Sequence, residues 1–556
     1  MTIGTTCRGK MSLLGLALAL AGCAHSSSPI EAASGPEVGI EPGALRGIEN
    51  SGIRSFKGIP YAAAAVGERR WKPPQRPASW TGVRDAREFG PACIQPPVPA
   101  RSIYNDPPAA TSEDCLSLNV WSPEDARRAP VIVWLHGGSL RIGASSLPLY
   151  DGNNYASRGV VFVSVNYRLG PLGWLAHEEL SGESPAGISG NYGLLDQIAA
   201  LEWVRDNIAA FGGDPANVTV MGESAGALST TYLMVSPQAR GLFGKAIIQS
   251  TNVRSFPELS QDDNRTPSAE RIGAELLSDL GASDIAAARA LEAQDLTERA
   301  TAAGFIPQGT IDGVVLPRQL VDIFDSGDQA RVPLIVGFNA HEFRPEGGLG
   351  PRMPSSLKEY EERIESIYGN LAPEFLRLYP AGEGADALLD AAGDGIFGWS
   401  GERIALSQRD LGLESYFYIF DHCYPAAERR DLCGFHASEL PFSFGNLDAE
   451  ALPDRWPVPD GTSDRAVSDA MLDYWTSFAA SGNPHGEGLL DWQAYGSQQN
   501  YLRFVDTPVA GRDPRPGMFE LHEAFSRRQR ELGRSWGQAI GLAAEPEEPS
   551  TTRIKQ

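Results

Sequence analysis

The segment G-E-S-A-G at residues 222–226 constrains the fold more than any other part of this sequence. It follows a short β-rich run at residues 218–221 and precedes a helical pattern at residues 225–234. A serine in the pattern G-x-S-x-G, between a strand and a helix, occupies a sharp turn that exposes its hydroxyl at the end of the strand. Glycine makes up 60 of the 556 residues, so about 0.4 such matches are expected by chance. The rest of the chain must therefore decide whether Ser224 is a nucleophile.

Apolar runs typical of buried strands alternate with helical patterns along the chain. Strands are predicted at residues 131–135, 160–165, 218–221, 246–249, 334–337 and 416–420, and helices at residues 194–210 and 225–234. This alternation favours an α/β fold, with a mostly parallel central sheet and helices on both faces. The Ala-rich helical stretch at about 260–310 is a large insertion. Ligands of such sheets bind at the carboxyl ends of the strands.

The composition fits a soluble globular protein, with 42% hydrophobic and 21% charged residues. The formal net charge of −23 argues against a nucleic-acid-binding surface, which would be basic. We therefore expect no nucleic-acid partner.

The N-terminus has the features of an export signal. Arg8 and Lys10 precede an apolar run at residues 11–21, which is too short for a stable membrane span. The sequence L-A-G-C at residues 20–23 resembles a bacterial lipoprotein cleavage box. We expect residues 1–22 to be a lipoprotein signal peptide and Cys23 to become the lipidated N-terminus. The alternative is an ordinary secretory signal that is cut nearby.

These features predict the domain organisation and the location. Residues 23–43 are rich in Ser, Pro and Gly and are predicted to be a flexible tether. Residues 44–541 form the predicted folded domain, and the acidic tail at 542–556 is predicted to be disordered. The chain is then exported to the bacterial cell envelope and attached to a membrane through its N-terminal lipid. The oligomeric state stays open.

The cysteine count is consistent with export. Once Cys7 leaves with the signal and Cys23 takes lipid, an even number remains in a compartment that permits disulfides. These four allow three pairings, of which we favour the one that closes short loops: Cys93–Cys115 and Cys423–Cys433. The alternative is that one pair stays reduced and buried. No CxxC or Cys/His cluster indicates a metal site.

A nucleophilic serine needs a base and a third group that orients the base. In α/β-hydrolases the chain order is serine, then acid, then histidine. Glu342 follows the predicted strand at 334–337, and His436 lies in the loop after the strand at 416–420. Both positions are at strand ends, as this chemistry requires. The other histidines that remain open as the base are His422, His485 and His522.

Several further motifs occur in a fixed order along the chain. They are F-K-G-I-P-Y-A at 56–62, E-D-C-L-S-L-N-V at 113–120, H-G-G at 136–138, N-Y-R-L-G at 166–170, G-N-Y-G-L-L-D-Q at 190–197, F-G-G-D-P at 211–215, and F-H at 435–436 followed by E-L-P at 439–441. Together with the serine turn, they resemble the type-B carboxylesterases, the family that includes the cholinesterases. The resemblance spans about residues 47–495.

The resemblance implies an α/β-hydrolase fold and a serine hydrolase that cleaves small carboxylic esters through an acyl-enzyme, without a cofactor. It implies Ser224 as nucleophile, Glu342 as acid and His436 as base, and it also implies the Cys93–Cys115 disulfide. The residues expected to bind the oxyanion through backbone N–H groups are Gly138, Ser139 and Ala225.

This sequence departs from the family pattern at three places. Ser139 and Leu140 stand where the family usually has a glycine and an aromatic residue, so we expect less space at the carbonyl and a preference for less bulky alcohol groups. Phe343 replaces the glycine that usually follows the acid. The loop from Cys93 to Cys115 contains Tyr104 but no tryptophan, so choline-ester specificity is not predicted.

Two alternative functions remain from the sequence. One is a hydrolase of a specific natural-product ester, lactone or thioester, which the fold and the triad do not separate from a general esterase. The other is a non-catalytic binding protein on the same fold. The intact set of serine, acid and histidine argues against this second alternative.

Overall fold

A computed structural model describes residues 35–263, 266–344, 354, 356–380, 385–537 and 540. The chain divides into two units, Met1–Gly35 and Pro36–Gln556. The predicted signal peptide, Cys23, most of the predicted tether and the predicted tail at 542–556 lie outside the described residues.

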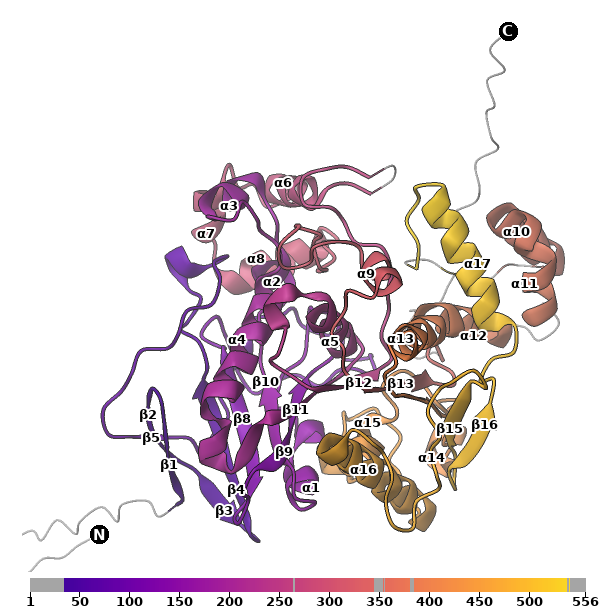
Figure 1. The fold of residues 1–556 in the computed structure, drawn as a ribbon. Helices are drawn as coiled ribbons and strands as arrows, with labels where there is room; N and C mark the ends of the chain where they lie inside the picture. Colours follow the sequence, from indigo (N-terminus) through magenta and orange to yellow (C-terminus); the bar gives the residue numbers. More distant parts are fainter. Residues whose placement is uncertain are drawn as a thin grey trace, which may run out of the picture. The chain divides into compact units, whose positions relative to one another are not determined.

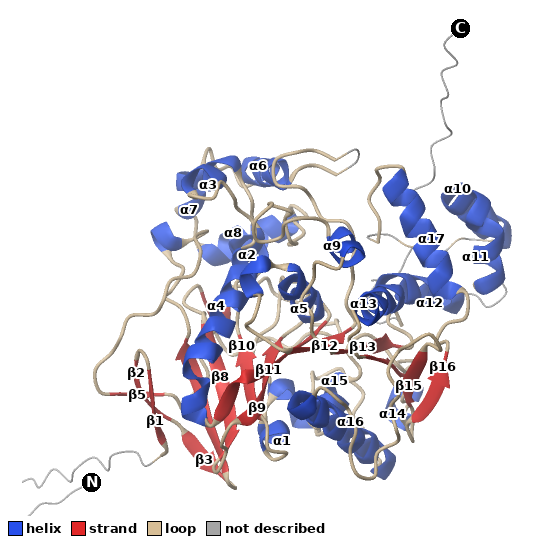
Figure 2. Ribbon diagram, in the orientation of Figure 1, coloured by secondary structure: helices blue, strands red, loops and turns tan. Residues whose placement is uncertain are grey.

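The second unit is organised around an 11-stranded sheet (Figures 1 and 2). In spatial order its strands are β16 (Val509–Arg512), β15 (Asn500–Phe504), β14 (Ser415–Phe420), β13 (Leu334–Asn339), β12 (Lys245–Gln249), β11 (Gly213–Glu223), β9 (Ala129–Leu135), β10 (Val161–Val165), β8 (Ser117–Pro123), β4 (Ile53–Pro60) and β3 (Ile48–Asn50). The strands from β15 to β10 run parallel, whereas both edges of the sheet are antiparallel. The predicted mostly parallel α/β sheet is confirmed.

Successive side chains of the central strands point to opposite faces of the sheet. In β9, Val131 and Val133 belong to one buried cluster, and Ile132 and Trp134 belong to the other. Helices cover both faces (Figures 1 and 2). One layer contains α4 (Tyr192–Asn207), α5 (Ala225–Val235) and α13 (Trp399–Asp410), and the other contains α1 (Asn153–Ala156), α15 (Leu440–Phe444) and α16 (Thr462–Ser481). Burial on both faces explains why the central strands are continuous apolar runs.

Helical insertions follow the carboxyl ends of the central strands. The predicted helical stretch contains α6 (Ala269–Asp279), α7 (Ile285–Arg289) and α8 (Ala293–Ala302). Between β13 and β14 lie α10 (Leu357–Tyr368), α11 (Ala372–Leu378), α12 (Ala385–Gly393), a π-helical turn (Asp394–Gly398) and α13. The remaining α-helices are α2 (Gly170–Trp174), α3 (Glu178–Glu183), α9 (Leu320–Ser326), α14 (Pro425–Glu428) and α17 (Met518–Glu531). None of the helices in the described ranges is long and apolar enough to span a bilayer.

The folded unit begins earlier than the sequence predicted. Residues of the predicted tether form β1 (Glu37–Ile40), which pairs antiparallel with β2 (Gly43–Arg46). β2 in turn pairs with β5 (Val83–Asp85), and Val38 is buried. The boundary at residue 44 was wrong because Glu41 and Pro42 form a two-residue hairpin turn, followed by Gly43 at the start of β2, rather than part of a linker. A further short pair joins β6 (Ala92–Cys93) to β7 (Thr111–Ser112).

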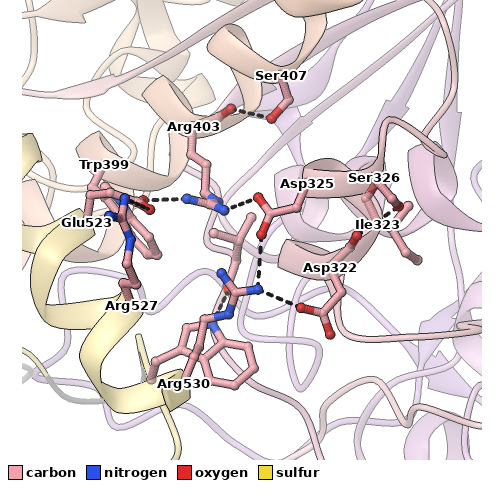
Figure 3. A network of polar contacts seen from close by, with 12 residues as sticks. Asp322, Ile323, Asp325, Ser326, Trp399, Arg403, Ser407, Glu523, Arg527 and Arg530 are labelled. Atoms are coloured by element: carbon pink, nitrogen blue, oxygen red, sulfur yellow. Dashed lines mark hydrogen bonds and ion pairs between the residues drawn. The ribbon is translucent and has the colours of Figure 1, made fainter.

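A network of charged side chains fastens α17 to α9 and α13 (Figure 3). Arg403 of α13 pairs with both Asp325 of α9 and Glu523 of α17. Arg530 of α17 lies 2.7 Å from Asp322 and 3.0 Å from Asp325. Arg403 joins carboxylates of α9 and α17, and Arg530 joins α17 to two carboxylates of α9, so the network fixes the position of α17 against α9 and α13.

Candidate active site

Ser224 lies in the turn between β11 and α5, with a backbone φ of +55°. A non-glycine residue rarely adopts this conformation, which occurs in strained turns at functional sites. Both flanking glycines are required by close packing. A Cβ at Gly226 would lie 1.9 Å from the carbonyl oxygen of Leu135, and a Cβ at Gly222 would lie 2.3 Å from backbone atoms of Gly226. The spacing of the motif therefore follows from the crowding around the serine.

The structure brings Ser224, His436 and Glu342 into one hydrogen-bonded chain. The Oγ of Ser224 lies 2.8 Å from Nε2 of His436, and Nδ1 of His436 lies 2.6 Å from Oε2 of Glu342. These three residues come from loops after β11, β14 and β13, and they are the three expected from the sequence. The imidazole can accept the proton of the serine hydroxyl, and the carboxylate stabilises the resulting imidazolium.

Glu342 is itself held in place by donors from two strands. Its Oε1 accepts hydrogen bonds from the hydroxyl of Ser250 at 2.7 Å and from the backbone N–H of Asn339 at 2.8 Å. Ser250 directly follows β12, and Asn339 ends β13. With Oε2 facing the imidazole, both carboxylate oxygens are engaged. Glu342 is only 3% exposed, and these hydrogen bonds therefore fix the orientation of its carboxylate.

Two further buried carboxyl groups lie beside His436. Oε1 of Glu223 is 3.3 Å from Nε2 of His436, and Glu439 accepts hydrogen bonds from the amides of Asn339 at 2.6 Å and Gln249 at 3.1 Å. Burial raises the pKa of Glu223 to about 8 and that of Glu439 to about 7. Burial opposes the charge on His436, but Glu223 and Glu342 outweigh it and raise the pKa of His436 to about 9. In their ionised forms, these carboxylates therefore favour the imidazolium over the neutral imidazole.

A turn rich in backbone donors lies next to the serine. Its residues Gly138, Ser139 and Leu140 have φ values of +105°, +57° and +57°, and Gly137 packs so closely that a Cβ there would lie 3.2 Å from Cβ of Ser224. Within the described part of the chain, the N–H groups of Gly138, Ser139 and Ala225 have no hydrogen-bond acceptor. Free N–H groups of this kind can bind a developing oxyanion.

His136 supports this turn through its Nδ1, which lies 2.8 Å from the carbonyl oxygen of Gly137. Its ring stacks on Tyr167 at 4.5 Å, and the hydroxyl of Tyr167 donates to the carbonyl of His136 at 2.6 Å. Burial lowers the pKa of His136 to about 4, so its ring is neutral.

The disulfides join Cys93 to Cys115 and Cys423 to Cys433, the pairing predicted from the sequence. Both lie in segments that reach the site. Gln95, two residues after the first disulfide cysteine, exchanges two hydrogen bonds of 2.9 Å with the backbone of Gly143 beyond the donor turn. The second disulfide closes the loop that ends three residues before His436.

The other candidate histidines have structural partners instead. His422 is buried with Nε2 2.7 Å from Asp464, His522 is buried 3.0 Å from the hydroxyl of Tyr379, and His485 pairs with Asp491 at 2.6 Å. None of the three contacts Ser224 in the described part of the chain.

Comparison with known proteins identifies the family. The model of the carboxylesterase family matches residues 34–518. The chain is a member of the carboxylesterase family. Among its relatives, the enzyme is 37% identical to fumonisin B1 esterase of Sphingopyxis macrogoltabida, over 84% of this chain and 85% of the relative. It is 34% identical to para-nitrobenzyl esterase of Bacillus subtilis (strain 168), over 84% of this chain and 94% of the relative.

The solved structures agree. A PNB esterase structure superposes with a TM-score of 0.76 at 33% identity, covering 88% of this chain and 99% of the other. A carboxylesterase of Geobacillus stearothermophilus superposes with a TM-score of 0.74 at 35% identity, covering 88% of this chain and 99% of the other. The predicted α/β-hydrolase fold is confirmed, and the enzyme is a serine hydrolase of carboxylic esters.

Sequence reasoning missed the residues that support the triad. They are Ser250, Asn339, Gln249 and, in part, Glu439, which appeared only as a family match. Ser250 and Asn339 lie at the carboxyl ends of predicted strands, so strand-end polar residues were a usable signal.

Proposed function

We propose that Ser224, His436 and Glu342 are the catalytic triad of this esterase. His436 takes the proton of Ser224 as its Oγ attacks the ester carbonyl carbon. Glu342 keeps the imidazole in the tautomer that carries the proton on Nδ1, so that Nε2 is free to accept. The imidazolium then protonates the departing alcohol, which leaves the acyl group on Ser224. Water, deprotonated by the same imidazole, hydrolyses this acyl-enzyme.

The oxyanion of each tetrahedral intermediate is bound by the N–H groups of Gly138, Ser139 and Ala225. Donors held rigidly for this charge contribute about 3–4 kcal/mol each to transition-state stabilisation in related hydrolases. The left-handed backbone at Gly138 and Ser139 supports this assignment, because it directs successive N–H groups to the same side of the turn.

The single observation that carries the proposal is the continuous chain of contacts from Ser224 to Glu342, 2.8 Å and 2.6 Å long at its two links. The test is hydrolysis of p-nitrophenyl esters from acetate to decanoate by soluble protein that begins at Ala24. Ser224→Ala should lower the rate by several orders of magnitude without loss of folding. A folded Ser224→Ala variant that keeps the parent rate would overturn the assignment.

The substrate class is a small-molecule carboxylic ester. The names of the relatives span fumonisin B1, para-nitrobenzyl esters and phenmedipham, so a specific natural-product ester remains a second candidate. Fumonisin B1 is therefore included beside the p-nitrophenyl esters. A kcat/KM for fumonisin B1 well above that for every simple ester would favour the specialised function.

The enzyme is further proposed to be an exported lipoprotein anchored through Cys23. The signal-like residues 1–22 and the L-A-G-C sequence support this. Expressed from its full chain in a bacterial host, the enzyme should sediment with membranes and require detergent for release. Cys23→Ser should prevent lipid attachment and release active enzyme, whereas Cys7→Ser, within the signal, should not. Equal release of all three proteins without detergent would contradict the anchor.

A further inference from the structure

The imidazole of His436 is stacked against an aromatic ring that the triad itself does not include. The ring of Phe397 lies 5.0 Å from the imidazole, with an interplanar angle of 23°. Behind it, Phe343 stacks on Phe397 at 5.7 Å and 28°. Tyr104 approaches the imidazole edge-on at 6.5 Å, and its hydroxyl donates to the carbonyl of His436 at 3.2 Å. The imidazole is thus contacted by rings on its face and at its edge.

Phe397 owes its position to the π-helical turn Asp394–Gly398 between α12 and α13. Such turns add one residue to a helical turn, which rotates the following side chains relative to a regular helix, and they are frequent at functional sites. The glycines at its start and within it allow close packing. A Cβ at Gly393 would lie 3.3 Å from Cβ of Glu342, and one at Gly395 would lie 2.9 Å from the ring of His522.

Polar contacts hold the same turn in place. Asp394 accepts hydrogen bonds from Nε of Arg515 at 2.8 Å and from the hydroxyl of Tyr379 at 3.1 Å. Arg515 also donates to the carbonyl of Ala340 at 3.1 Å, two residues before Glu342. The turn is therefore tied directly to the loop that carries the acid of the triad.

The charged network described above supports the turn from its other side. His522, which packs on Gly395, belongs to α17, and so does Phe519, whose ring would lie 2.6 Å from a Cβ at Gly398. Arg403 and Arg530 fix α17 to α9 and α13 (Figure 3). The ring of Phe397 is thus held by the packing of the π-helical turn against α17 and by the polar contacts of that turn, and not by a free loop.

We propose that Phe397 is a positioning residue for the proposed general base: its ring holds the plane of the His436 imidazole so that Nε2 faces Ser224 while Nδ1 faces Glu342. Hydrogen bonds to imidazole nitrogens are directed in the plane of the ring, and a ring stacked on that plane opposes tilting and rotation about the Cβ–Cγ bond. The inference rests on the proposed catalytic role of His436. The ionisable groups that face the imidazole are Glu223 and Glu342, with Glu439 and the Tyr104 hydroxyl nearby.

The test compares Phe397→Leu with Phe397→Tyr in the enzyme beginning at Ala24. Leucine fills most of the space but cannot stack, whereas tyrosine keeps the ring. With p-nitrophenyl acetate, Phe397→Leu should lower kcat about 5- to 10-fold with little change in KM, and Phe397→Tyr should restore most of the rate. Phe343→Leu should have a smaller effect, because Phe343 acts on the imidazole only through Phe397. Ile396→Leu, in the same turn, is the matched control and should keep the parent rate.

A second readout separates positioning from a general structural role. An aromatic face also stabilises a cation above it, so the acid limb of the kcat/KM profile should move to lower pH in Phe397→Leu and not in Phe397→Tyr. Full activity of Phe397→Leu on the acetate ester, or an equal loss in the tyrosine variant, would overturn the inference. A rise in KM that grows with substrate size, with kcat unchanged, would also overturn the inference. It would show that Phe397 only lines the substrate pocket. An error in the proposed triad would give a different result, because the Ser224→Ala variant would then keep the esterase activity of the parent enzyme.

Discussion

Glu342 holds His436 at two points. Its Oε2 lies 2.6 Å from Nδ1 of the imidazole, and its backbone carbonyl accepts the backbone N–H of His436 at 3.2 Å. The loop of the acid and the loop of the base are therefore joined by main chain as well as by side chain. Small changes in the position of Glu342 should reach the imidazole directly.

Removing the hydroxyl that orients Glu342 should lower the rate without preventing folding. Ser250→Ala deletes the 2.7 Å hydrogen bond to Oε1 and leaves only the Asn339 N–H on that oxygen. We expect kcat/KM to fall about 10-fold, because hydrogen bonds to groups that orient a catalytic residue have effects of this size. Ser468→Ala removes a buried hydroxyl bond to Phe442 elsewhere and serves as the control. Equal rates for both variants would contradict the positioning of Glu342 by Ser250.

The charge of Glu223 should set the acid limb of the pH profile. The proposed base His436 must be neutral to accept a proton, and the nearby Glu223 carboxylate favours the imidazolium and raises the pKa of His436. In Glu223→Gln this attraction is lost, the pKa of His436 falls, and the acid limb of kcat/KM should move to lower pH by about one unit. Glu450→Gln, at an exposed site, should leave the limb in place. A limb that moves to higher pH, or not at all, would exclude this electrostatic role.

Crowding at the serine turn predicts that two glycine substitutions differ strongly in their effect on the free energy of unfolding. Gly226→Ala places a methyl group 1.9 Å from the carbonyl oxygen of Leu135, so we expect a loss of about 3 kcal/mol or more in the free energy of unfolding. Gly182→Ala, in α3 with no atom within 4 Å of the added Cβ, should be neutral or slightly stabilising. Urea denaturation of both variants measures the difference. Similar stabilities would show that the turn is less crowded than described.

Much of the fold and of the site was predictable because its signals are local. The strand runs and the G-x-S-x-G turn are contiguous in sequence. Strand-end positions favour Glu342 and His436, and the family resemblance implied them as acid and base. The hairpin of β1 was missed, because Gly and Pro in a turn resemble a linker when the pairing partner is unknown. Phe397 was also missed, because its contact with His436 depends on a π-helical turn that Arg515, Tyr379 and α17 hold together from distant parts of the chain. Such long-range packing leaves no periodic pattern.

The side chain of Ser139 should limit the size of the alcohol group. Ser139 has a φ of +57° in the donor turn and is exposed at the site. Ser139→Gly removes its Cβ and relieves the left-handed strain, so activity on tert-butyl acetate relative to ethyl acetate should rise several-fold. Initial rates on the two esters give this ratio. If the parent enzyme already prefers the tert-butyl ester, the Ser139 side chain does not limit the size of the alcohol group.

The central claim is that Ser224 becomes covalently acylated while His436 acts as its base. The most direct measurement uses diethyl p-nitrophenyl phosphate, which traps an activated serine as a stable phosphoryl ester, followed by mass spectrometry of the digested enzyme. We predict a single modified residue, Ser224, with modification and loss of esterase activity proceeding in parallel, and much slower modification in His436→Ala. Modification at another residue, or full activity after complete modification of Ser224, would contradict the account.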